Sequence, residues 1–400
     1  MGNYKFSSAR IICLVLLMMG LIGFSAIFLA FTSSASSAQE SQEQIQHEER
    51  VINIEVPVRV FKGSTFIDNL GMTDFEVYED GKIQKIEAVY LIKKTDVAQK
   101  LEKATTFNPD ISRRFVFVFE LHEYLPRVRY VVEDFFDRVI APGDSLYVVT
   151  PVKNYNFKKE SLSLIDKEKI ADQLVDILKK DLVLGNTEYR NVMKQIEDVF
   201  AMEVPFDLKQ SMYLEAARRL KGMKTFNEQN LQVFADFLRD KEGQKHVFLF
   251  YQKEIIPILD GVDDFSLAEL KKDVTFDTER IRRIFSDSSI SVNFLFVTNK
   301  PSFMGDLDIG KMKPLRVRLM DQSYSVFSAF REVSATTGGI ADSSANVLAS
   351  FQKAATAAEN YYLIYYSSSD YKPDGKFRKI EVKVKNRNYR ITHRAGYFAD

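Results

Sequence analysis

The chain of 400 residues has a single cysteine, Cys13, and only four histidines. Cys13 lies inside an N-terminal apolar run, so the rest of the chain has no thiol for a disulfide, a cysteine nucleophile or a thiolate metal site. The histidines show no paired spacing of the kind that metal sites use. The fold beyond the apolar run must therefore be stabilised by an apolar core.

An excess of charge of either sign is also missing, because 55 lysines and arginines balance 55 aspartates and glutamates. No global field therefore attracts nucleic acid. Hydrophobic residues make up 46% of the chain and charged residues 28%, which is typical of folded globular proteins. We expect a folded chain with no nucleic-acid partner.

The N-terminus has the pattern of an export signal. Lys5 and Arg10 precede an uncharged apolar run over residues 11–31, and small polar residues follow. This order predicts a signal peptide over residues 1–38. The run approaches the length of a membrane-spanning helix, so an uncleaved anchor in the inner membrane is the alternative. Either outcome places the chain after residue 40 in the periplasm, the outer envelope or the extracellular space.

The next segments differ in periodicity. Residues 39–50 are polar and rich in Gln and Glu, which indicates a linker. Alternation of apolar and polar residues over 51–94, with an Asp-Gly turn at Gly81, predicts a small β-module. Residues 95–112 are a charged connector.

Residues 113–367 have the pattern of an α/β domain. The apolar run at 115–119 predicts a strand that is buried on both faces, and later strands alternate with helices up to a last strand at 361–366. A helical excursion at 182–241 is longer than one crossover needs, and residues 368–400 read as a β-hairpin. The sequence predicts a mostly parallel, Rossmann-like sheet with helices on both faces.

Several stretches carry motifs in a characteristic order and distance. They are residues 71–84, 336–339, 361–366, 374–384 and 396–398. Together these stretches resemble bacterial exported proteins that contain a VWFA-related domain. The resemblance implies a von Willebrand A-like fold over residues 113–367, a preceding β-module, and an envelope or extracellular setting. It implies no catalytic activity.

The fold that this resemblance implies often binds a divalent cation through Asp-x-Ser-x-Ser after its first strand and an aspartate after a later strand. Here Glu120 replaces the aspartate, His122 and Tyr124 replace the serines, and Gln252 replaces the later aspartate. Mg²⁺ requires small oxygen ligands in near-octahedral geometry, and the neighbouring Lys253 adds a positive charge. We therefore expect a degenerate site without metal or other cofactor.

Two other interpretations of these residues stay open. Glu120, His122 and Glu123 are suitable ligands for a replacement zinc site, but a polar strand end at the surface with a hydrogen-bonded His122 is the favoured interpretation. A hydrolase that uses Glu120 or Glu123 as a base is the enzymatic alternative, but no serine, histidine and acid occur at an informative spacing. Gly338 and Gly339 follow a helix, so we expect one of them to cap it rather than to hold a phosphate.

The helical stretch at 206–238 is rich in methionine and aromatic residues, which favours either core packing or a pliable docking surface. Met212, Tyr213, Met223 and Phe226 are the candidate partner-binding residues. The sequence thus predicts an exported, metal-independent protein-binding module that is not an enzyme. A structural envelope component tethered by its N-terminal helix is the alternative.

Overall fold

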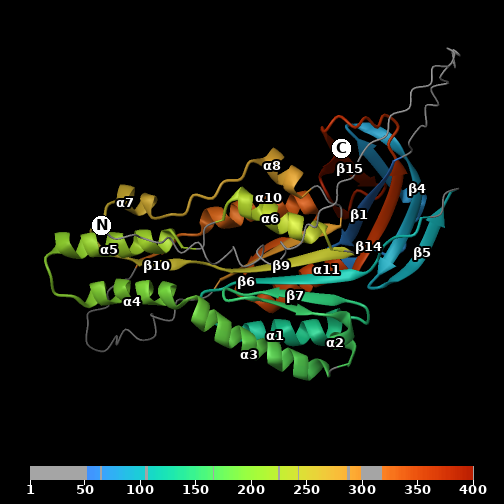
Figure 1. The fold of residues 1–400 in the computed structure, drawn as a ribbon. Coiled ribbons are helices and arrows are strands. Elements are labelled where there is room, and N and C mark those ends of the chain that lie inside the picture. Colours follow the sequence, from blue (N-terminus) through green and yellow to red (C-terminus); the bar gives the residue numbers. More distant parts are fainter. Residues whose placement is uncertain are drawn as a thin grey trace, which may run out of the picture. The chain divides into compact units, whose positions relative to one another are not determined.

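The computed structural model describes residues 52–399, except for residues 64, 104–106, 165, 224–225, 242, 286–288 and 299–317. The signal peptide or anchor predicted over residues 1–38 and the linker over 39–50 lie outside the described residues. Within the described ranges, no helix combines the length and the hydropathy needed to cross a bilayer. Residues 53–400 form one unit with two large sheets (Figure 1).

The larger sheet has nine strands, and its pairings are antiparallel. Its order is β16-β1-β14-β4-β3-β15-β17, with β2 beside β1 and β5 beside β4. The first and last strands of the described chain both belong to this sheet, where Figure 1 shows blue and red strands together. The strands are β1 (Asn53–Lys62), β2 (Thr65–Phe66), β3 (Phe75–Glu79), β4 (Lys82–Lys93), β5 (Asp96–Glu102), β14 (Asn360–Ser367), β15 (Phe377–Val384), β16 (Arg390–His393) and β17 (Gly396–Phe398).

Strand periodicity explains the core of this sheet. Val56, Val58 and Val60 alternate along β1, and all three are fully buried in one cluster, because successive side chains of a strand point to opposite faces. The predicted Asp-Gly turn is confirmed. Asp80 and Gly81 have φ values of 48° and 81° and join β3 to β4, as a two-residue hairpin turn requires.

The second sheet has six strands in the order β13-β11-β9-β6-β7-β8. Its first five strands are parallel, and β8 is antiparallel at one edge, so the sheet is mixed. A two-stranded sheet pairs β10 (Ile255–Ile258) with β12 (Arg318–Asp321). The six strands are β6 (Arg113–Glu120), β7 (Ser145–Val149), β8 (Asn154–Phe157), β9 (Gln244–Gln252), β11 (Ile290–Val297) and β13 (Ala341–Ser344).

Helices pack on both faces of the six-stranded sheet (Figure 1). Phe115, Phe117 and Phe119 of β6 pack on α1 (Arg127–Asp134), its π-helical continuation η3 (Phe135–Val139), α3 (Lys167–Gly185) and α11 (Val347–Glu359). Val116 faces the other side, which is covered by α6 (Glu228–Arg239), α8 (Thr278–Ile284) and α10 (Tyr324–Thr337). The short helix α2 (Lys159–Leu164) lies beside β7, with Leu162 packed on the same core as α1 and α3, and η2 (Met72–Asp74) precedes β3 of the larger sheet.

Three further helices form a separate bundle with its own core, α4 (Thr187–Ala201), α5 (Phe206–Lys221) and α7 (Asp264–Glu269). They extend beyond the ends of the parallel strands (Figure 1). The range 182–241, predicted as a helical excursion, contains α4, α5 and α6. The predicted glycine cap is also confirmed, since Gly338 ends α10 with φ of 69°.

The predicted fold class is wrong. The largest sheet is antiparallel and the other is mixed, so the chain is not organised as a mostly parallel, Rossmann-like or von Willebrand A-like sheet with small additions. β14, predicted as the last parallel strand, pairs antiparallel with β1 and β4. The predicted connector contributes β5, and the predicted C-terminal hairpin contributes β15, β16 and β17. An apolar strand has the same pattern in any sheet that is covered on both faces, so periodicity alone does not assign it to a sheet.

Candidate functional site

Polar side chains meet where β6 and β9 end. These parallel neighbours align Glu120 with Tyr251, so the residues that follow both strands lie at one edge of the sheet. The backbone N–H of His122 donates to Gln252 Oε1 at 3.2 Å, and Gln252 Nε2 donates to Glu123 Oε1 at 2.9 Å. Gln252 therefore joins the two strand ends through its amide, at the position where the resemblance implies a metal-binding aspartate.

The loop after β6 is held against the helices that follow. The His122 ring stacks on Tyr189 of α4 with 4.5 Å between ring centroids, and Asn186 Nδ2 donates to the Leu121 carbonyl at 2.8 Å. Tyr124 packs away from this point, on the core around α1 and α3, with Lys179 Nζ 5.9 Å from its ring centroid. The structure thus brings His122 and Gln252 together and separates Tyr124 from them.

The residues at this edge show no ligand set for a metal. Within the described part of the chain, no three His, Cys, Asp or Glu side chains are placed to hold an ion. The zinc alternative with Glu120, His122 and Glu123 therefore has no geometric support. One Glu123 oxygen already accepts the Gln252 amide, and the His122 ring is stacked on Tyr189.

A buried charged pair lies behind this edge, and sequence reasoning missed it. Lys272 Nζ is 2.8 Å from Glu254 Oε1, and the two side chains are only 3% and 1% exposed. Lys272 also donates to the Met223 carbonyl at 2.5 Å, and Tyr251 donates its hydroxyl to Glu254. Burial and the Glu254 carboxylate hold the pKa of Tyr251 well above its usual value, so the phenol keeps its proton and acts as a donor.

This pair attaches the helical bundle to the sheet. Glu254 follows β9, Lys272 follows α7, and Met223 follows α5. The backbone N–H of Glu254 also donates to Ser323 Oγ at 3.0 Å, just before α10. A lysine and a glutamate that lie 18 residues apart leave no periodic signal in the sequence, so only the tertiary structure shows that they meet.

The predicted partner-binding residues contribute mainly to core packing. Tyr213 is fully buried, its hydroxyl donates to the Pro257 carbonyl at 2.9 Å, and burial raises its pKa to about 12. Met212 and Met223 are half-buried against the same core. Phe226 packs edge-on against another ring, that of Phe330 in α10, with centroids 4.9 Å apart. These four side chains do not form one exposed surface.

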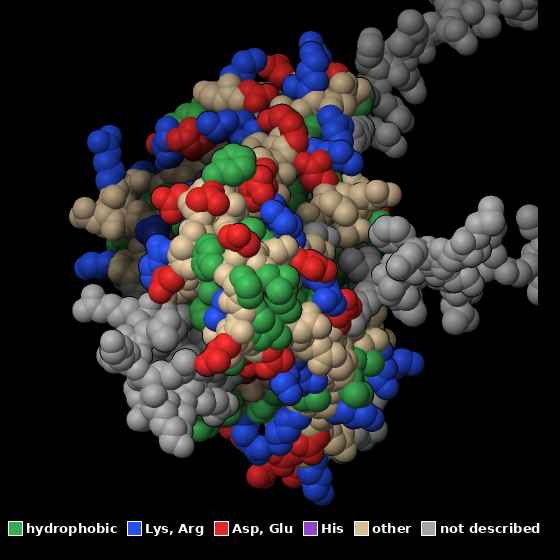
Figure 2. Space-filling view, turned by 90° about the vertical axis from the view of Figure 1, so that its left-hand side faces the viewer, with side chains coloured by type: hydrophobic (Ala, Val, Ile, Leu, Met, Phe, Trp, Pro, Cys, Tyr) green, Lys and Arg blue, Asp and Glu red, His purple; other side chains and the backbone are tan. Residues whose placement is uncertain are grey.

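Other apolar side chains of the bundle are exposed at its far end. They are Met202 after α4, Phe206 and Leu208 at the start of α5, and Phe265 in α7, with exposed fractions of 36%, 44%, 51% and 75%. We call this set the apolar tip. Gly261 lets the Phe206 ring lie against the loop before α7, because a Cβ at Gly261 would be 2.6 Å from that ring. Figure 2 shows hydrophobic side chains gathered on this end of the protein.

The rim of the apolar tip is mainly acidic, although Arg318 lies 3.6 Å from Asp260 and Lys209 donates to the Met202 carbonyl at 2.9 Å. Exposed acidic side chains occur in the same short segments as its apolar residues, and Figure 2 shows Asp and Glu around the hydrophobic area. Asp263 caps α7 by accepting from the backbone N–H of Ser266 at 2.9 Å, and hydrogen bonds from Ser266 hold the pKa of Asp263 below its usual value. Asp263 is therefore ionised at neutral pH. The acidic residues are Glu203, Asp207, Asp260, Asp263 and Asp264.

Comparison with known proteins assigns no family to this arrangement. No protein family model, no curated protein and no solved structure matches the chain. The resemblance to exported proteins with a VWFA-related domain therefore stays a prediction. The function is inferred below from the geometry of the described residues.

Proposed function

We propose that this chain is a non-enzymatic protein-binding module at the cell envelope or outside the cell, and that the apolar tip contacts its partner. The observation that carries the proposal is the exposure of four large apolar side chains on one end of the helical bundle. Full burial of one such side chain contributes roughly 1.5–3 kcal/mol, so a partner that covers several of them gains useful affinity.

The surroundings of the tip define the chemistry of the partner. An apolar centre with a charged rim is the usual anatomy of a protein interface. Because acidic side chains outnumber Lys209 and Arg318 on the rim, it favours a segment that presents leucine or phenylalanine on one face and lysine or arginine beside them. We therefore assign the tip to a basic amphipathic helix of a partner protein. No step of this recognition uses a metal ion.

A direct binding assay tests this assignment. A synthetic amphipathic helix of leucine and lysine is titrated against the purified chain, and a version with glutamate in place of lysine serves as the charge control. We expect the basic peptide to bind, the acidic peptide to fail, and added salt to weaken binding because the rim charges are exposed. Chelator leaves the affinity unchanged if recognition is metal-independent.

Variants of the tip locate the binding surface. Leu208→Ser and Phe265→Ser each lower the affinity for the basic peptide at least about tenfold, which corresponds to about 1.4 kcal/mol. The matched control is Ile83→Ser. Ile83 is also an exposed apolar residue, with an exposed fraction of 65%, but it lies in β4 of the nine-stranded sheet, outside the apolar tip. Thermal unfolding midpoints change little in all three variants, because the side chains are exposed. Equal affinity of the tip variants and the control variant contradicts the proposal.

A further inference from the structure

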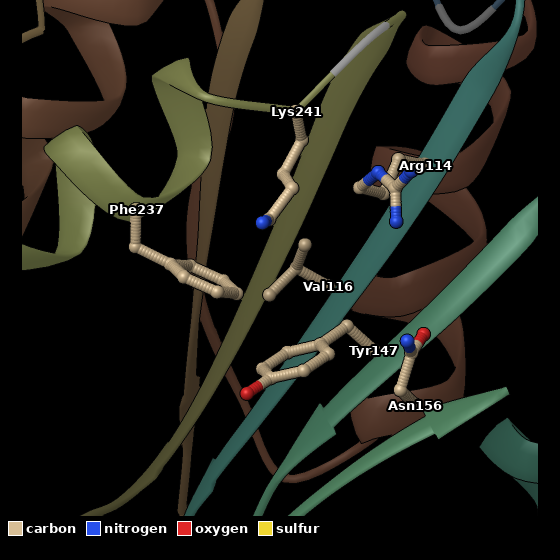
Figure 3. Close-up of a pocket in the computed structure, with 6 residues that line it drawn as sticks. All are labelled: Arg114, Val116, Tyr147, Asn156, Phe237 and Lys241. Carbon is tan, nitrogen blue, oxygen red and sulfur yellow. The ribbon is translucent and has the colours of Figure 1, made fainter. Parts of the chain in front are cut away.

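A small pocket lies on the face of the six-stranded sheet that carries α6. Its volume is about 110 Å³. Strands β6, β7 and β8 contribute its floor and one wall, and the C-terminal end of α6 with the residues just after it contributes the other wall (Figure 3). The lining residues are Arg114, Val116, Tyr147, Asn156, Phe237 and Lys241.

Two cations share this pocket. Figure 3 shows the Lys241 amino group on one side of Val116 and the Arg114 guanidinium on the other, and Lys241 Nζ lies 4.9 Å from the centroid of the Phe237 ring. None of the described residues that line the pocket is a carboxylate. The Nε atom of Arg114 is buried and has no hydrogen-bond partner in the described part of the chain. A buried donor without an acceptor is costly, and two neighbouring cations repel, so an anion placed between them relieves both effects.

The rest of the lining is apolar or neutral. The rings of Tyr147 and Phe237 have centroids 5.1 Å apart, and Val116 lies beside them in the pocket. Burial raises the pKa of Tyr147, so its hydroxyl stays protonated at neutral pH. The Asn156 amide adds a neutral donor and acceptor. An inorganic anion satisfies the cations but leaves the aromatic wall without a contact.

We propose that this pocket binds an organic carboxylate whose anionic group lies between Arg114 and Lys241 and whose small apolar body contacts Tyr147 and Phe237. A guanidinium suits a carboxylate because its two parallel N–H groups match the two carboxylate oxygens. At about 110 Å³ the pocket is smaller than an engineered cavity of roughly 150 Å³ that binds benzene, so it takes the carboxylate and part of one ring, and the rest of the ring lies outside it. The pocket and the apolar tip share no residue, so this site is separate from the proposed protein interface.

Benzoate is the probe, and titration is followed by nuclear magnetic resonance on the isotope-labelled full chain. We expect saturable shifts at the lining residues with a dissociation constant on the order of 1–10 mM, as is usual for a fragment of this size. Benzamide has the same shape without the charge and is expected not to bind. Rising ionic strength should weaken the binding of benzoate.

Variants show which side chains hold the anion. Arg114→Gln and Lys241→Gln are each expected to weaken benzoate binding at least about fivefold. The matched control is Lys153→Gln, because Lys153 is an exposed lysine of the nearby β7–β8 turn that does not line the pocket. Circular dichroism and thermal unfolding confirm that the variants are folded.

Two further ligands distinguish the possible sources of the carboxylate. A hexapeptide that ends in phenylalanine tests a chain terminus, and its C-terminal amide is the control. Tighter binding of the peptide acid assigns the site to protein C-termini, and tighter binding of benzoate assigns it to free small acids; either result supports a carboxylate site. The proposal is overturned if benzoate causes no shift, if benzamide or phosphate binds as well as benzoate, or if both pocket variants keep the affinity of the control variant.

Discussion

Replacement of Lys272 by methionine removes the cation from a buried carboxylate and keeps most of the side-chain volume. Lys272 and Glu254 are 3% and 1% exposed, and 2.8 Å separates their charged atoms. Loss of one partner of such a pair leaves an uncompensated buried charge, which costs about 3–5 kcal/mol. Since domains are stable by only about 5–15 kcal/mol, Lys272→Met should lose a large part of the free energy of unfolding.

Urea unfolding followed by circular dichroism measures this loss as a lower midpoint at an unchanged slope. The matched control is Lys253→Met. Its amino group is 3.2 Å from Asp321, but the two side chains are 28% and 19% exposed, so we expect a loss below about 1 kcal/mol. In the double variant Lys272→Met with Glu254→Gln, the carboxylate becomes a neutral amide and most of the lost stability should return.

The comparison of these variants decides whether charge isolation is the cause. If Lys272→Met costs no more than Lys253→Met, the buried pair contributes little and our reasoning about it is refuted. If the double variant is as unstable as Lys272→Met alone, the loss arises from packing rather than from the isolated charge. Lys272 also donates to the Met223 carbonyl, just after α5. Loss of Lys272 should therefore also speed amide hydrogen exchange in α5.

Two further predictions concern pH and backbone packing. Burial holds the pKa of His246 well below its usual value of about 6.5, so below pH 6.5 the unfolded chain binds a proton that the folded chain does not. As pH falls below 6.5, the free energy of unfolding should therefore decrease by up to about 1.4 kcal/mol per pH unit. His246→Phe should flatten this dependence of stability on pH between about pH 6.5 and 5, and an unchanged dependence contradicts the prediction. A Cβ at Gly339 would lie 2.0 Å from the Val292 carbonyl oxygen, so Gly339→Ala should destabilise the chain by more than about 2 kcal/mol. Thermal unfolding measures this loss of stability. The control is Gly375→Ala, which should cost only about 1 kcal/mol because Gly375 has φ of 65° but open space around it. Equal losses of stability in the two variants argue against a clash at Gly339.

Local features of this chain followed from the sequence because they depend on neighbours along it. The alternation over residues 51–60 predicted a half-buried strand; the strand is confirmed as β1, but both of its faces are buried from Val56 to Phe61. The Asp-Gly turn and the left-handed cap at Gly338 follow from backbone sterics at single residues. Residues 182–241 read as mostly helical from the sequence, and α4, α5 and α6 lie in this range.

The partners of these elements were decided by tertiary structure. Tyr361 to Tyr366 are apolar enough for a parallel strand between helices, yet β14 lies in the antiparallel sheet, because pairing depends on segments about 300 residues away. The same limit applies to the candidate sites. Helical spacing alone does not distinguish the buried Tyr213 from the exposed Leu208 in the same helix. The anion pocket combines side chains that lie up to 127 positions apart, so only the folded chain brings its two cations together.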